Sequence, residues 1–155
     1  MATKDNAPER ARMDKLQPDK APVDKPKMPP INVWAAPVLI GWIIPGGGHF
    51  FLKRPGRGVL LLLSITLMFL LGLMMRGMMF TPQSGDLLTT VINYGGFVGD
   101  LASGALYLVA MMFGYSQPDM AGAVHDYGTK FLVTAGLLNI LAIVDAYEIA
   151  AERKS

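Results

Sequence analysis

The sequence predicts an all-α integral membrane protein, a bundle of about four helices that follows a disordered N-terminal tail. Two observations lead to this prediction. Over half of the 155 residues are hydrophobic and only 17% are charged, against about 25% in a typical soluble domain. The long apolar runs also lack the two-residue alternation of a barrel strand, and in lipid only helices or closed barrels satisfy the backbone.

Residues 1–30 differ from the rest of the chain. They contain six prolines, seven basic and five acidic side chains, and no apolar periodicity. Such a segment cannot bury enough apolar surface to offset the entropy lost on ordering. We therefore expect three parts: a disordered polar tail over 1–30, a transmembrane helical domain over 31–150 and a polar C-terminal end over 151–155.

The first apolar run covers residues 31–52 and is interrupted near its end by Pro45 and Gly46–Gly48. Its helical part is then about 14 residues long, which is short for a span of about 20. Two topologies remain open. The segment either crosses the membrane with help from residues 50–52, or it is re-entrant. A basic turn with the sequence KRPGR, residues 53–57, follows it.

The three later runs are longer. Residues 58–75 carry no charge, and at 1.5 Å per residue this stretch is about 27 Å long, close to the hydrocarbon thickness. Residues 87–115 contain one charge, Asp100, and form either one helix or two helices split at Gly99–Asp100. The fourth run covers about 127–149, and its charged end extends into water.

Asp100 is the most informative single residue. A carboxylate at mid-membrane depth is costly, and such residues usually face a partner, a cavity or an ion path. We expect its partner to be His49, Arg76, Asn139 or a second copy of the chain. The candidate intramembrane polar site is therefore made of Asp100, His49 and Asn139, because Asn139 of the fourth run also points at a neighbouring helix.

Small residues recur in the third run at every fourth position. Residues at this spacing share one helix face, and small side chains let helix backbones approach closely in lipid. The predicted helix-packing face consists of Gly95, Gly99 and Ser103.

The basic turn predicts contact with lipid headgroups. Each basic group near an anionic membrane surface contributes about 1 kcal/mol of attraction. The candidate headgroup ligands are Lys53, Arg54 and Arg57. Asp145, near the end of the fourth run, is expected at the membrane interface.

No catalytic, cofactor or metal site is predicted. The chain has no cysteine, which removes disulfides, thiolate metal sites and cysteine nucleophiles. It also lacks the G-K-[ST], HExxH and GxSxG patterns of nucleotide, zinc and serine-hydrolase sites. A net charge of +2 without a basic stripe argues against nucleic acid as a partner.

Counting basic residues does not choose between the two topologies. With four spans, ten Lys and Arg side chains lie on the side of the N-terminus and four lie opposite; with a re-entrant first segment, eleven lie on that side. Cytoplasmic segments carry the excess of basic residues. Both topologies therefore predict a cytoplasmic N-terminus.

The stretch IPGGGHFFLKRPGRGVLLLL resembles the helical hairpin of two-transmembrane-domain proteins over about residues 35–75. These proteins have a Gly-rich helix end, an aromatic pair, a short basic turn and a second apolar helix. Their basic turn generally faces the cytoplasm, which implies here a re-entrant first segment or an external N-terminus.

A closer resemblance covers Val38 to Lys154. The strings DYGTKFLVTAGLLN and VDAYEIA are similar to those of a bacterial family of small membrane proteins of unknown function. This resemblance implies a helical membrane fold and brings no activity, cofactor or partner.

Three functional hypotheses follow. The first is a structural or accessory protein, a scaffold or minor subunit of a complex in the bacterial inner membrane. Its expected partners are the lipid bilayer and either other membrane-protein subunits or a second copy of the chain. The second is a transporter- or channel-like oligomer that uses Asp100. The third is a membrane enzyme acting on lipid through His49 with Asp100 or Asp126.

Overall fold

A computed structural model describes residues 29–117 and 121–151, and every regular element in these ranges is an α-helix. The predicted tail and the polar C-terminal end lie outside the described residues, apart from residues 29, 30 and 151. The helices are α2 (Ile31–Ile43), α3 (Gly47–Phe51), α4 (Pro55–Met74), α5 (Leu87–Ala102), α6 (Ala105–Met112) and α7 (Ala123–Ala150). The predicted all-α fold class is confirmed.

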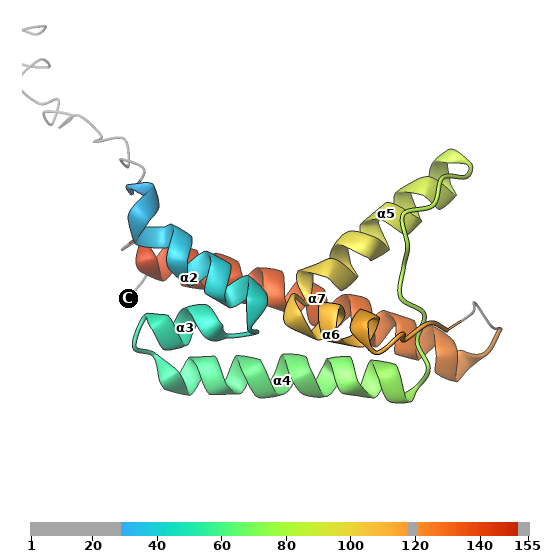
Figure 1. Ribbon diagram of the computed structural model, residues 1–155, viewed down its shortest axis with the longest axis horizontal. Helices are drawn as coiled ribbons and strands as arrows, with labels where there is room; N and C mark the ends of the chain where they lie inside the picture. Colours follow the sequence, from blue (N-terminus) through green and yellow to red (C-terminus); the bar gives the residue numbers. More distant parts are fainter. Residues whose placement is uncertain (1–28, 118–120, 152–155) are drawn as a thin grey trace, which may run out of the picture.

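Helices α4 and α7 form the frame of the molecule (Figure 1). They have 20 and 28 residues and are long and apolar enough to cross a membrane. They are antiparallel, because Arg57 near the start of α4 lies beside Asp145 near the end of α7, whereas Met78, after α4, bonds to Thr129 near the start of α7. The two helices indicate that the protein is located in a membrane.

The core lies where α4, α6 and α7 meet. Ile65 and Phe69 of α4 are buried against Leu132 and Ala135 of α7, with Ala110 of α6 beside them. Most other large apolar side chains of α4 are exposed. This one-sided burial suits a helix whose remaining surface contacts lipid, because exposed apolar surface on this scale is unfavourable in water.

Helices α2 and α3 form a short hairpin at one end of this frame. Trp34 contacts Tyr147 with ring centroids 5.5 Å apart, and Trp42 reaches Asn139, so that α2 runs antiparallel to α7. The chain then turns back at residues 44–46, and α3 lies against α2, α4 and α7. Figure 1 shows α4 starting at the end of the molecule where α2 starts. The first apolar run therefore returns to its starting end, in the geometry of the re-entrant alternative.

Helices α5 and α6 form a similar segment that leaves the opposite end of the frame and turns back toward it. Each of these two segments, α2–α3 and α5–α6, is called an excursion. Helices α5 and α6 are bent by 101° at a break of Ser103 and Gly104. Helix α5 approaches the middle of α7, and α6 turns back toward the end of α4, where the Tyr115 hydroxyl donates to the Gly77 carbonyl at 2.8 Å. Together α5 and α6 are apolar enough for one broken span. Figure 1 shows, however, that the start of α5, which extends away from the frame, and the end of α6 both lie toward the end of the molecule where α4 ends.

The break in this excursion corrects the predicted split at Gly99–Asp100. Helix α5 continues through both residues and ends at Ala102. Gly104 has a φ of +63°, and a Cβ atom at this position would overlap the carbonyl oxygen of Trp42. Only glycine tolerates this conformation and this approach. The contact with α2 therefore fixes the site of the break.

Candidate functional site

The candidate site lies where the two excursions meet on α7. Asn139 is fully buried there, and its side-chain amide donates to the Ala102 carbonyl at 2.9 Å and to the Trp42 carbonyl at 3.5 Å. These two carbonyls are at the C-terminal ends of α5 and α2, where the helices leave acceptors unpaired. Trp42 also reaches across, since its indole N–H donates to the Leu101 carbonyl at 3.2 Å. Asn139 thus joins both helix ends to α7.

Small residues allow this junction to close. A Cβ atom on Gly136 would overlap the carbonyl oxygen of Gly99, and the Ser103 hydroxyl lies 3.1 Å from the same Cβ position. Gly99 and Ser103, two members of the predicted packing face, therefore lie against α7. The third, Gly95, is exposed with no atom within 4 Å of its Cβ position. The predicted face thus divides between the interior and the surface of the protein.

Asp100 is fully buried on α5. Its Oδ2 atom accepts the Phe80 backbone N–H at 2.7 Å. The Phe80 ring covers Gly96, where a Cβ atom would overlap the ring. Within the described ranges the Oδ1 atom has no hydrogen-bond partner. The bond to Phe80 holds the irregular segment after α4 against α5. The partner of Asp100 is therefore a backbone N–H group, whereas a side chain or a second copy of the chain was expected.

The three residues expected beside Asp100 take part in other contacts. The side chain of His49 is paired with Asp145 and that of Asn139 with the two helix ends, whereas Arg76 contributes its backbone carbonyl to His125 Nδ1 at 2.7 Å. Thr129 of α7 accepts the Met78 N–H at 2.9 Å. Residues 76–80 are therefore held by side chains of α5 and α7, a role that sequence reasoning did not assign to Thr129 or His125.

His49 forms the second buried polar contact of the frame. It is fully buried on α3, and its Nε2 atom lies 2.9 Å from Asp145 Oδ2. Arg57 lies 3.7 Å from the same carboxylate oxygen. The structure thus pairs His49 with Asp145, a residue for which only a place at the membrane interface was expected. His49 does not pair with Asp100 or Asp126, a pairing that the hypothesis of a lipid-acting enzyme required. Lys53 and Arg54 belong to the turn beside this cluster.

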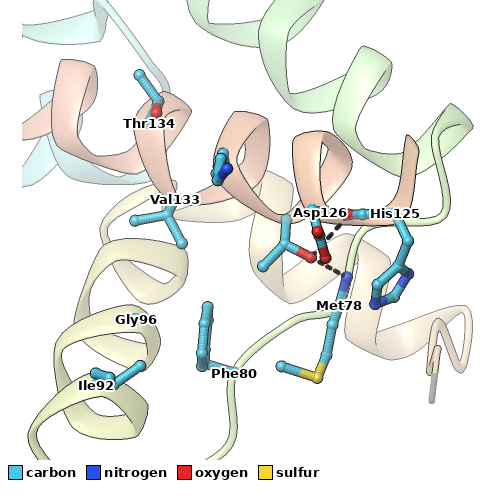
Figure 2. Close-up of a pocket in the computed structure, with 10 residues that line it drawn as sticks. Met78, Phe80, Ile92, Gly96, His125, Asp126, Val133 and Thr134 are labelled. Atoms are coloured by element: carbon cyan, nitrogen blue, oxygen red, sulfur yellow. Dashed lines mark hydrogen bonds between the residues drawn. The ribbon is translucent and has the colours of Figure 1, made fainter. Parts of the chain in front are cut away.

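A cavity of about 550 Å³ opens between α5, α7 and residues 78–80 (Figure 2). Its lining includes the apolar side chains of Phe80, Ile92 and Val133 and the charged side chains of Asp126 and Lys130. The described residues contain no group of three or more His, Cys, Asp or Glu side chains suited to a metal ion.

Comparison with known proteins supports the coarser part of the expected resemblance. A sequence model of a family of unknown function, DUF6677, matches residues 36–155. No curated protein and no solved structure matches the chain. The likeness to two-transmembrane-domain proteins and the bacterial origin stay expectations. The family match runs from within α2 to the C-terminal end and covers most of the sequence. The chain therefore belongs to DUF6677, a family of unknown function.

Proposed function

We propose that the protein is a small multi-pass membrane protein with a structural or accessory role, as a scaffold or minor subunit of a membrane complex. One observation carries this proposal: three buried polar side chains bind backbone groups at helix ends and irregular segments. These side chains are Asn139, Asp100 and His125. Backbone groups left unpaired in lipid are costly. Side chains used in this way hold a fixed shape, which suits a scaffold.

The outer face of α5 is the surface we expect a partner helix to contact. Val91, Gly95 and Val98 are exposed there, and Gly95 offers open space. In lipid, helices associate through close packing around small residues, because apolar area alone provides no driving force. The part of α5 that extends away from the frame in Figure 1 makes this face accessible.

Gly95→Leu is therefore expected to weaken association without unfolding the protein. The wild type, extracted in a mild detergent, should co-purify with the same membrane proteins at a fixed ratio in independent preparations. The variant should lose most of this material while its own abundance stays unchanged. Gly56→Leu is the matched control, since Gly56 of α4 also has no atom within 4 Å of its Cβ position. A wild type that migrates alone in native gels would contradict the accessory role.

We further propose a topology with two crossing helices, α4 and α7, and with the α2–α3 and α5–α6 excursions each returning to the side from which it starts. Twelve of the fourteen Lys and Arg side chains then share one side: seven in residues 1–30, three in the basic turn and two at 153–154. Only Arg76 and Lys130 lie opposite. The excess of basic residues marks the cytoplasmic side, which supports a cytoplasmic N-terminus for the proposed inner-membrane protein.

A second candidate function, proton or cation transfer, is favoured by the buried Asp100 Oδ1 atom that lacks a partner in the described part of the chain. Intramembrane carboxylates of this kind often serve ion paths. Asp100→Asn keeps an oxygen that accepts the Phe80 N–H and removes the titratable proton. If the protein transfers protons or cations, the Asp100→Asn variant should show a proton or cation flux at least about tenfold lower than the wild type, in proteoliposomes that contain equal amounts of protein. Unchanged flux, or no flux in the wild type, would exclude this function for Asp100.

A further inference from the structure

The cavity in Figure 2 has chemically different ends. Figure 2 shows Phe80, Ile92 and Val133 near Gly96 of α5, with Thr134 beyond Val133, and Asp126 nearer the start of α7. Lys130, one turn after Asp126 on α7, also lines the cavity. A volume of about 550 Å³ lies in the range of ligand sites, which are mostly apolar with a few polar groups that fix orientation. The two ends together have the layout of a site for an amphiphile.

The polar end carries two opposite charges that are not joined to each other. Asp126 and Lys130 are four residues apart on α7, a spacing at which side chains are neighbours. Within residues 29–117 and 121–151 no salt bridge links them. The Lys130 ammonium instead lies over the Tyr127 ring, 5.2 Å from its centroid. Both side chains are exposed, so a ligand with one negative and one positive group meets a complementary partner for each.

The depth of these charges fits a lipid headgroup. At 1.5 Å per residue, Lys130 and Asp126 lie about 14 Å and about 20 Å from Asn139 along α7. The hydrocarbon core extends about 15 Å on either side of its midplane. With the bilayer midplane placed at Asn139, near the middle of α7, Lys130 lies at the edge of the hydrocarbon core, Asp126 lies at headgroup level, and Val133 lies at the depth of acyl chains.

We propose that this cavity binds a phospholipid whose headgroup is zwitterionic. Lys130 contacts the phosphate, Asp126 contacts the ammonium group, and one acyl chain passes over Ile92 and Val133. The pairing of charges selects this class, because only a zwitterionic headgroup offers Asp126 an ammonium group, whereas the neutral glycerol of phosphatidylglycerol leaves that carboxylate without a counter-charge. This inference does not rest on the accessory role, since lipid retention is measured whether or not a protein partner is present.

The test is native mass spectrometry of the purified full chain in a mild detergent, with phosphatidylethanolamine or phosphatidylglycerol of identical acyl chains added. The wild type is expected to retain phosphatidylethanolamine at least fivefold better. Lys130→Gln should reduce retention of both lipids at least fivefold. Asp126→Asn should remove the preference between them. Ile92→Trp, which fills the apolar end, should reduce retention of both.

Two control variants separate the site from general effects. Arg76→Gln removes a basic residue outside the cavity, and Leu88→Trp adds the same bulk on α5 outside the cavity; both should bind lipid as the wild type does. Equal retention of the two lipids by the wild type would overturn the zwitterionic assignment. Wild-type retention by Lys130→Gln and Ile92→Trp would overturn the site. Because these side chains are exposed, each variant should elute as the same monodisperse species.

Discussion

Gly136→Ala is expected to destabilise the protein by about 3 kcal/mol or more, the upper part of the range for overpacking. The added Cβ atom would overlap the carbonyl oxygen of Gly99. That oxygen belongs to the backbone of α5 and cannot move aside as a flexible side chain does. Helix α5 must then separate from α7, and the contact of Asn139 with Ala102 is lost. The midpoint of thermal unfolding in a mild detergent should fall by several degrees, with lower abundance in the membrane.

Gly95→Ala is the matched control for this prediction. Gly95 lies in the same pair of packed helices but faces open space. Alanine favours a helix interior by about 0.5–1 kcal/mol over glycine. The control should therefore unfold at an equal or higher temperature. An unchanged unfolding midpoint for Gly136→Ala would show that α5 and α7 are not in close contact.

Asn139→Asp is expected to have the second large effect. The wild-type amide donates to carbonyls at the C-terminal ends of α5 and α2. A carboxylate in its place has no N–H to donate and opposes the partial negative charge of both helix ends. Burying such a charge without a partner should cost about 3 kcal/mol or more. Asn139→Leu, which removes the donors without adding charge, should cost about 1–2 kcal/mol.

Asn93→Asp is the matched control, because it makes the same chemical change at a position that is less buried than Asn139. The Asn93 side chain is half-buried and its bond to the Gln83 carbonyl is long, at 3.4 Å. A carboxylate at this position is not enclosed by the protein, so we expect a change below about 0.5 kcal/mol. If Asn139→Asp and Asn93→Asp unfold at the same temperature, Asn139 does not join the two helix ends.

The sequence was sufficient for the positions of the helices. Charges, prolines and glycines delimit the apolar runs, and α4 and α7 match runs two and four to within a few residues. These signals are local, because clustered charges and Pro-Gly segments flank the apolar runs. A single proline or charge does not end a helix, since Pro37 lies inside α2 and Asp100 inside α5. The re-entrant alternative for the first run was also predicted from local signals, because Pro45 and Gly46 make the helix shorter than a full span.

The contacts between distant residues could not be predicted in this way. His49 and Asp145 are 96 residues apart, and their pairing depends on α3 turning back beside α7. The break at Gly104 depends on the Trp42 carbonyl, although Gly99–Asp100 is an equally good local signal. The stripe of Gly95, Gly99 and Ser103 was visible as a period of four. Which of its members are buried depends on where α5 separates from α7.

In the proposed topology, α4 and α7 cross the membrane, and the α2–α3 and α5–α6 excursions each return to their own side. Because the chain has no cysteine, single cysteines can be introduced at Arg54, Gln83, Ala121 and Ala151 and labelled with a membrane-impermeant maleimide. Positions 83 and 121 should be labelled in intact cells, and positions 54 and 151 only after permeabilisation. Labelling of 83 and 121 from opposite sides would make α5–α6 a full span and contradict the account.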